Sequence, residues 1–189
     1  MRSAAARSRT DGGAGRQHTR ALTLAALFLS VLLFCSGFQG ADFPGRFEQV
    51  AGRENGGSFD RHVSVVRRGV RLDAMVLVAP VTIRAPLAGY AGSLTLDCVA
   101  APVFNVGDGM QMDVLLRTGG DDHLLYTRYF DAGRRAEDRA WVPLSIPLEV
   151  ADASRSELVI MVSGGPQGDL IADWLALASI RLTQSAHRR

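Results

Sequence analysis

The stretch MQMDVLLRTGGDDHLLYTRYF, residues 110–130, indicates the fold class most directly. Apolar side chains occupy every second position over residues 110–116, and the other face of this segment carries Gln111, Asp113 and Arg117. A period of two is that of a half-buried β-strand. The Gly-Gly-Asp-Asp sequence that follows has the composition of a tight turn, and a second apolar stretch comes after it. The stretch therefore predicts two antiparallel strands joined by a solvated hairpin turn.

The same alternation of short apolar stretches with Gly- or Asp-rich separators extends over residues 61–183. Strand centres lie about 10 to 15 residues apart, and no long segment has the helical period. Residues 158–162, LVIMV, are apolar on both faces, which favours a central strand. We therefore predict an all-β fold, a jelly-roll β-sandwich of about eight strands. The expected strands cover residues 62–66, 70–78, 81–84, 93–99, 110–118, 123–130, 140–146, 157–163 and 171–182.

An uncharged apolar segment, residues 21–38, follows a basic tail at residues 1–20 that contains five Arg and one Asp. This order is typical of a signal peptide or a membrane anchor. As a helix the segment spans about 27 Å, close to the about 30 Å of a hydrocarbon core, so its length leaves both alternatives open. We expect a hydrophobic N-terminal helix that is cleaved near Phe38, retained as a transmembrane helix, or lipidated at Cys35. In each case the rest of the chain is exported across the cytoplasmic membrane, to be membrane-anchored or secreted or periplasmic.

The chain of 189 residues, with 47% hydrophobic content, suffices for one domain with appendages. Residues 39–60 are rich in Gly and charge and have no sustained period, so we predict a flexible linker there. The sandwich is expected to extend over residues 61–183, and residues 184–189 are expected to form a C-terminal tail.

The formal net charge of +2 is unevenly distributed. From residue 38 onward the chain contains 16 Arg and 18 acidic residues, a formal charge of −2, so the basic excess belongs to the N-terminal tail. Phosphate binding needs a concentrated basic face, and we therefore expect no nucleic-acid partner. All 21 basic residues are Arg, which excludes chemistry that depends on a lysine, such as Schiff-base formation.

Sequence motifs of nucleophilic catalysis or zinc binding are missing: there is no G-x-S-x-G, C-x-x-C or H-E-x-x-H. Cys98 lies in the alternating segment SLTLDCVA and is interpreted as a small buried hydrophobic residue. The acidic pair Asp121-Asp122 beside His123 is interpreted as a solvated hairpin tip. We expect no catalytic residue and no cofactor, and a structural calcium ion with unknown ligands stays an open alternative.

Five short segments follow one another in an order found in a known group of domains. They are Asp108-Gly109-Met110, Trp141 to Leu144, Leu158 to Val162, Gly165 to Asp169 and Asp173-Trp174. In this order the chain resembles the galactose-binding-domain-like β-sandwich, in particular modules of the NPCBM type on bacterial envelope and carbohydrate-active proteins. The resemblance covers about residues 61–183. It implies a jelly roll that binds carbohydrate or another surface ligand on loops at one end, in some members with a structural calcium ion.

A sugar-binding site combines an aromatic face for stacking with polar groups for the hydroxyls. Trp174 alternates with apolar residues in its predicted strand, so we interpret it as a core anchor, and Asp173 as a turn cap or a metal ligand. The two sets of candidate ligand-binding residues are the aromatic Tyr126, Tyr129 and Trp141 and the polar Asn105, Asp108, Asp121 and Arg128.

The function that these expectations favour is an exported, non-catalytic module that recognises carbohydrate at the bacterial cell envelope. The alternative is a structural or protein-interaction module of the envelope without a sugar site, so the partner is a glycan or an envelope protein. Residues 21–38 add the membrane as a partner if they are not cleaved. An aromatic side chain that projects from the loops at one end of the sandwich would favour the glycan.

Overall fold

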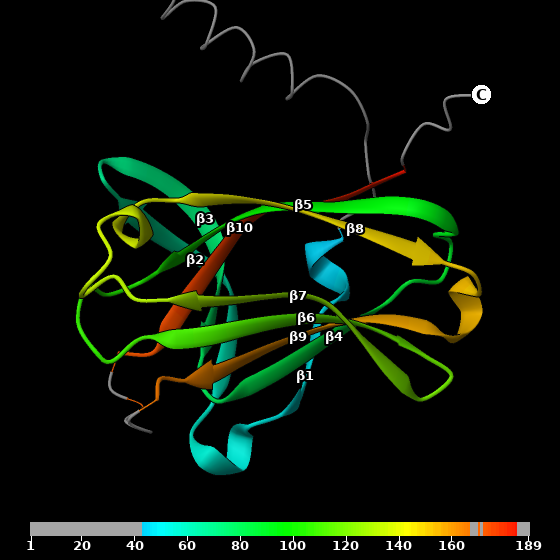
Figure 1. The fold of residues 1–189 in the computed structure, drawn as a ribbon, viewed down its shortest axis with the longest axis horizontal. Helices are drawn as coiled ribbons and strands as arrows, with labels where there is room; N and C mark the ends of the chain where they lie inside the picture. Colours follow the sequence, from blue (N-terminus) through cyan, green and yellow to red (C-terminus); the bar gives the residue numbers. More distant parts are fainter. Residues whose placement is uncertain (1–42, 167–169, 171, 185–189) are drawn as a thin grey trace, which may run out of the picture. The chain divides into compact units, whose positions relative to one another are not determined.

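The computed structural model describes residues 43–166, 170 and 172–184, which form two antiparallel five-stranded sheets packed face to face (Figure 1). One sheet has the strand order β1-β4-β9-β6-β7, and its strands are Glu48–Ala51 (β1), Val81–Pro86 (β4), Ser156–Gly164 (β9), Met110–Thr118 (β6) and Asp121–Phe130 (β7). The other has the order β2-β3-β10-β5-β8, with strands Ser58–Arg67 (β2), Val70–Val78 (β3), Trp174–Gln184 (β10), Gly92–Pro102 (β5) and Val142–Val150 (β8). Short 3₁₀ helices cover Pro44–Arg46, Arg53–Asn55, Glu137–Arg139 and Ala153–Arg155.

The eight strands β3 to β10 have the connectivity of a jelly roll, because the order β3-β10-β5-β8 in one sheet faces β4-β9-β6-β7 in the other. Strands β1 and β2 each add one edge strand, beside β4 and β3. The predicted all-β sandwich is thus confirmed. Strand β8 carries Pro143 and Pro147 and pairs only with β5, which is the edge position that a proline tolerates because it has no backbone N–H.

The hairpin of β6 and β7 bears out the alternation over residues 110–116. Met110, Met112 and Val114 are buried, whereas Gln111 is exposed on the other face. Residues 110–118 pair with 121–130 in an antiparallel register, with one bulge after Val114. On its other side β6 pairs with β9, which is central between β4 and β6, as its two apolar faces predicted.

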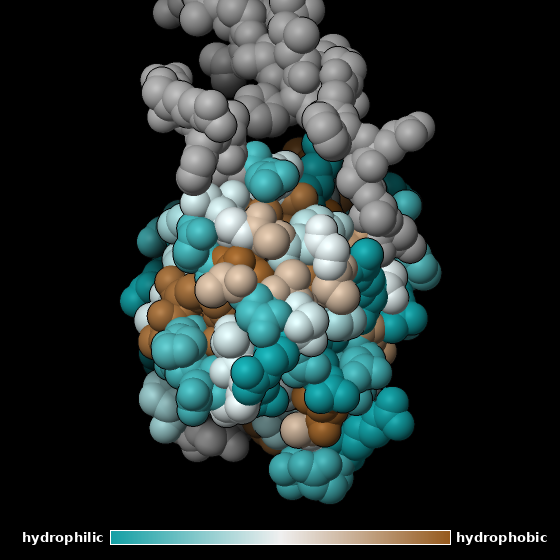
Figure 2. Space-filling view, turned by 90° about the vertical axis from the view of Figure 1, so that its right-hand side faces the viewer, coloured by the Kyte–Doolittle hydropathy of each residue, from teal (hydrophilic) through white to brown (hydrophobic). Residues whose placement is uncertain are grey.

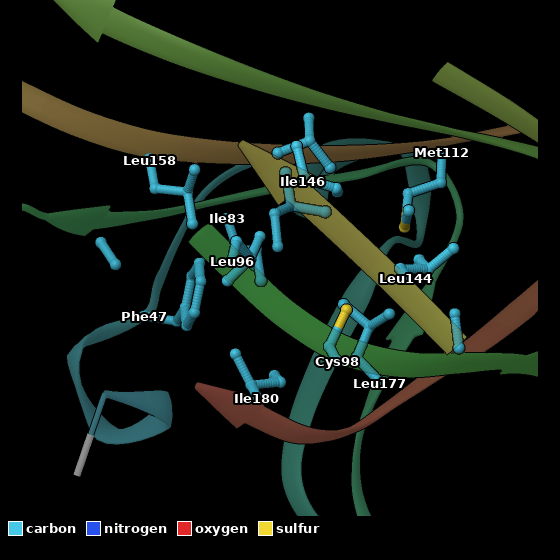
Figure 3. Packing of buried hydrophobic residues seen from close by; sticks show 14 of the residues in the cluster. Phe47, Ile83, Leu96, Cys98, Met112, Leu144, Ile146, Leu158, Leu177 and Ile180 are labelled. Atoms are coloured by element: carbon cyan, nitrogen blue, oxygen red, sulfur yellow. The ribbon is translucent and has the colours of Figure 1, made fainter. Parts of the chain in front are cut away.

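The main hydrophobic core lies between the two sheets (Figure 3). Phe47, Ile83, Met112 and Leu158 approach it from one side, and Leu96, Cys98, Leu144, Ile146, Leu177 and Ile180 from the other. Cys98 is buried as predicted, and the pKa of its thiol is raised to about 12, first by burial and then by the neighbouring charge of Asp97. The thiol of Cys98 therefore acts as an apolar group that packs in the core.

A second apolar cluster covers the outer face of the β2-β3-β10-β5-β8 sheet. Ala176 and Ala178 belong to it, whereas the alternate residues Leu175 and Leu177 point into the main core. The other fully buried members are Val65, Ala74 and Val76, which come from β2 and β3. Ala176 lies beside Val76 and Ala178 beside Ala74 on neighbouring strands, so these side chains pack side by side on the same face of the sheet.

The prediction of a flexible linker at residues 39–60 is wrong for its described part, residues 43–60. Phe43 and Phe47 are almost completely buried in the main core, with their rings 5.4 Å apart in an edge-to-face arrangement. Residues 48–51 pair with β4, and β2 already begins at Ser58. The high Gly and charge content indicated a flexible segment, but the segment also contains two aromatic residues. Burial of such large side chains stabilises it more than the local flexibility destabilises it.

Residues 1–42 and 185–189 lie outside the described part of the chain, and with them the basic tail, the apolar segment 21–38, Cys35 and most of the predicted C-terminal tail. In the described part, helices of membrane-spanning length and apolarity do not occur. The last strand begins at Trp174, three residues after its predicted start, and ends at Gln184.

Candidate functional site

Three connections meet at one end of the sandwich, on the left in Figure 1: the β2–β3 turn, residues 103–109 between β5 and β6, and residues 131–141 between β7 and β8. Two arginines of the turn join the three together. Arg67 donates from Nη1 to the Val103 carbonyl at 3.1 Å and from Nη2 to the Asn105 side chain. Arg68 donates to the Ala136 carbonyl at 2.8 Å. We call this end of the molecule the loop end.

An exposed aromatic pair lies at the loop end. The rings of Phe104 and Trp174 meet edge to face with centroids 5.2 Å apart, and the two residues are 39% and 38% exposed. The Val103 amide donates to the Trp174 carbonyl at 2.7 Å, which holds the β5–β6 loop beside the start of β10. A pair of rings that is packed on one side and open on the other can offer an apolar face to a ligand.

The prediction that Trp174 is a core anchor is therefore wrong, and a β-bulge explains why. The pairing of β10 with β5 shifts register between Ala178 and Arg181, and Ser179 has a left-handed backbone with φ 54°. Before the bulge the odd-numbered Leu175 points into the main core, and after it the even-numbered Ile180 does. An uninterrupted alternation from 174 to 182 would place all even positions on the same face, which the bulge prevents.

Two buried carboxylates lie under this surface. Asp173 accepts from the Gly165 amide at 3.4 Å, and a Cβ on Gly165 would lie 2.5 Å from Asp108 Oδ1. Only glycine therefore permits the start of the β9–β10 connection to approach Asp108 so closely. Asp108 was predicted to contact the ligand directly, but it is only 5% exposed and is therefore buried beneath the surface of the loop end.

The predicted aromatic platforms have structural contacts. Trp141 is half-buried against the second cluster and donates from Nε1 to the Val70 carbonyl at 3.1 Å, so it links β8 to the hairpin. Tyr129 donates its hydroxyl to the Asp108 carbonyl, and burial raises the pKa of that hydroxyl, followed by the charges of Asp131 and Asp108. Tyr126 packs against the main core. All three aromatic residues are therefore partly buried and have structural contacts within the domain.

Arg128 likewise has an internal role. Its Nη2 lies 2.6 Å from Oδ1 of Asp138, whose side chain is completely buried, and its guanidinium lies 4.8 Å from the Phe130 ring centroid. The other oxygen of Asp138 accepts from the Asp131 amide at 2.8 Å. This ion pair fixes the β7–β8 loop against β7.

The structure does not bring all predicted polar residues together. Asn105 is exposed at the loop end beside Phe104. Asp121 is exposed at the opposite end, where it begins β7 after the two-residue turn Gly119-Gly120. Within the described ranges no three His, Cys, Asp or Glu side chains are grouped as metal ligands. The calcium ion named above stays an untested expectation.

From the sequence we predicted neither Phe104 as a site residue nor the exposure of Trp174. Phe104 follows the β5 strand in the segment VFNVGDG, where an aromatic residue stands among turn-forming residues. Such a residue in a Gly- and Asp-rich loop is a usable signal, because loops run over the surface and an aromatic there has little core to enter. The exposure of Trp174 had no comparable local signal, since it depends on the bulge five residues later.

A comparison with protein-family models finds no match, and a comparison with curated protein sequences finds none either. Solved structures of similar fold do exist. One is the CBM22-1 and GH10 part of the endo-1,4-β-D-xylanase 10B of Clostridium thermocellum, complexed with xylohexaose, with a TM-score of 0.52 and 9% identity. That match covers 80% of this chain, which spans only 28% of the xylanase chain.

Two further structures are single modules. The CBM22-1 xylan-binding domain of Paenibacillus barcinonensis Xyn10C has a TM-score of 0.48 at 11% identity, over 74% of this chain and 87% of that one. The CBM51 of Clostridium perfringens GH95, in complex with methyl-galactose, has 0.47 at 13%, over 78% and 91%. The similarity to the xylanase structure concerns the fold alone, a β-sandwich of the kind that the resemblance predicted.

Proposed function

We propose that this chain is an exported, non-catalytic module that binds carbohydrate at the bacterial cell envelope through its loop end. The fold supports carbohydrate binding, since the sandwich is one that carbohydrate-binding modules use. Export rests on the apolar segment 21–38 and its basic flank, which have the composition of a signal peptide or anchor. A binding role without catalysis fits the sequence, which lacks the motifs of nucleophilic catalysis.

The exposed Phe104–Trp174 pair carries the proposal. The C–H face of a sugar ring packs on an aromatic ring and removes apolar area of both from water. Each of the two residues has more than a third of its surface accessible, and the edge-to-face packing of their rings reduces the entropy lost when a ligand binds.

Asn105 supplies a polar group beside this surface. Its Oδ1 accepts from Arg67, which orients the side-chain amide and leaves Nδ2 as the donor for a sugar hydroxyl. The arrangement combines an apolar face with an oriented polar group next to it, as a sugar of mixed polarity requires.

The test is glycan-array binding of the full-length protein, solubilised in mild detergent, with Trp174→Ala and Phe104→Ala variants. We expect retention of at least one glycan, and at least a tenfold loss of affinity in either variant, about 1.4 kcal/mol. Leu124→Ala is the matched control, because Leu124 is an exposed apolar residue of β7 that is not at the loop end, and it should bind like the unmodified chain.

Thermal unfolding distinguishes a lost contact from a lost fold. If every variant melts cooperatively and the unmodified chain binds no glycan, the proposal is wrong, and an envelope protein-interaction module becomes the better hypothesis. If Trp174→Ala alone fails to fold, Phe104→Ala decides the matter, since Phe104 lies in a loop outside both apolar clusters.

A further inference from the structure

The exposed charge of the loop end is one-sided. The three connections, residues 67–71, 103–109 and 131–141, contain six Arg and four acidic residues, and this basic excess stands out in a domain that is otherwise slightly acidic. Three of the four acids, Asp108, Asp131 and Asp138, are buried. Only Glu137 is exposed with the arginines.

The buried acids are committed to contacts inside the loop. Asp138 accepts from Arg128 and from the Asp131 amide, as described above. Asp131 accepts from the Arg134 amide at 2.9 Å and lies 3.7 Å from the guanidinium of the same residue. Their charge therefore stabilises the loop, and the charge facing solvent is predominantly positive.

Arg67 is the buried member of this group of cations. It is 6% exposed, and the acceptors of its hydrogen bonds, the Val103 carbonyl and the Asn105 amide oxygen, are both neutral. Within the described residues its Nε has no hydrogen-bond partner, and Arg67 forms no ion pair. Burial lowers the pKa of this guanidinium. A buried cation without a counter-charge is costly unless a partner supplies one.

Other arginines of the loop end are held in place by neutral carbonyls. Arg135 donates to the Tyr129 carbonyl at 3.2 Å, and Arg139 donates to the carbonyls of Ala132 at 2.7 Å and Gly133 at 2.8 Å. A Cβ on Gly133 would lie 3.7 Å from the Asn105 carbonyl, so this loop lies directly against the residue that follows Phe104. The arginine-bearing β7–β8 loop thus borders the loop that carries Phe104.

We infer that the ligand of the loop end is an acidic polysaccharide, whose sugar rings pack on Phe104 and Trp174 while its anionic groups meet the exposed arginines of the β2–β3 turn and the β7–β8 loop. This inference rests on the proposed function and names its ligand class. The guanidinium group suits an anion with paired oxygens, such as the carboxylate of a uronic acid or a sulfate ester, because its N–H donors form a planar fork.

The experiment compares polygalacturonate with its highly methyl-esterified form, which keeps the backbone and removes the charge. Binding of the full-length protein is measured by titration calorimetry at about 50 mM and about 500 mM NaCl, with xylan and galactan as neutral probes. We expect at least tenfold tighter binding to the acidic form at low salt and most of that advantage lost at high salt. Dextran sulfate distinguishes the anion, since tighter binding to it than to polygalacturonate assigns a sulfate ester.

The variants test which arginines contribute. Arg68→Gln and Arg134→Gln are chosen because both side chains are exposed, and each should weaken binding to polygalacturonate about threefold and reduce its salt dependence. Arg155→Gln is the matched control, because Arg155 is an exposed arginine at the opposite end, and it should change nothing.

The outcomes separate this inference from the proposed function. Equal binding of the two forms of polygalacturonate, or loss in Arg155→Gln equal to that in the other variants, overturns the acidic ligand. If a neutral glycan then still binds in a Trp174-dependent manner, the proposed function stands alone. If a folded protein retains none of these polysaccharides and no array glycan, both are wrong.

Discussion

The two ends of the sandwich are built differently. At the loop end two of the three connections are long, and their contacts include a completely buried carboxylate and an exposed aromatic pair. At the opposite end β6 and β7 are joined by two glycines, and the Arg117–Asp122 ion pair is open to solvent.

Figure 2 shows that opposite end, where hydrophobic residues (brown) are interspersed with hydrophilic (teal) and intermediate (white) residues. A shallow depression of about 390 Å³ lies there between Arg117, Gly119 and Arg155. Two ion pairs of similar length therefore lie in different surroundings, since both partners of Arg117–Asp122 are open to solvent whereas Asp138 in the Arg128–Asp138 pair is completely buried.

The largest expected difference between the ends concerns these ion pairs. Asp138→Asn should lower the free energy of unfolding by about 3 kcal/mol, because it leaves Arg128 partly buried without its counter-charge. Asp122→Asn, the matched change at the opposite end, should cost less than about 1 kcal/mol. Urea unfolding of both variants measures the difference, and equal losses would show that the two ends do not differ in this way.

A pair of glycines with similar backbones gives a second comparison. Gly109 at the loop end has φ 94° and Gly120 at the opposite end has φ 105°. A Cβ on Gly109 would lie 2.6 Å from the Phe130 carbonyl, whereas one on Gly120 would meet nothing within 4 Å.

Gly109→Ala should therefore cost at least about 2 kcal/mol, from backbone strain and overlap together, and Gly120→Ala about 1 kcal/mol, from strain alone. Chemical denaturation of the two variants checks this. A larger loss for Gly120→Ala would contradict the close packing assigned to the loop end.

Trp141→Phe sharpens the description of the loop end itself. The change keeps most of the apolar ring and removes the Nε1 hydrogen bond to the Val70 carbonyl, so we expect a loss of about 1 kcal/mol in the free energy of unfolding. Glycan affinity should change much less than in Trp174→Ala, because Trp141 links strands. If Trp141→Phe lost as much glycan affinity as Trp174→Ala without being destabilised, Trp141 would belong to the ligand-binding site.

The smallest effect is expected from acid titration at the opposite end. The hydrogen bond from Arg117 lowers the pKa of Asp122 below its ordinary 3.8. The contribution of this pair to stability is therefore complete above that ordinary value and is lost as the pH falls through the lower pKa of the folded state.

Since Asp122 is well exposed, the dependence should be slight and should diminish with salt. Urea midpoints of the unmodified chain and Asp122→Asn, measured from about pH 6 to about pH 3, compare the two. A steeper loss of stability at low pH in Asp122→Asn than in the unmodified chain would contradict the stabilising role assigned to this ion pair.

Much of the fold was predictable because its signals are local. Alternating side chains over residues 110–116, the apolar stretch 158–162 and Gly-rich separators each depend on neighbours along the chain. The candidate site was predictable only in part. Asn105 lies at the loop end as a candidate should, but Asp108 is buried and Asp121 lies at the other end.

By itself, then, the sequence determined an all-β chain, nine of its ten described strands to within a few residues, and the burial of Cys98, whereas it missed β1. Tertiary structure decided that Phe43 and Phe47 enter the core, that Trp174 is exposed, and that two neighbouring arginines of the β2–β3 turn contact two loops far away in the sequence. The physical reason is the range of the interactions. Alternation and turn composition act within a few residues, whereas a bulge in β10 and contacts between strands far apart in sequence depend on the whole sandwich.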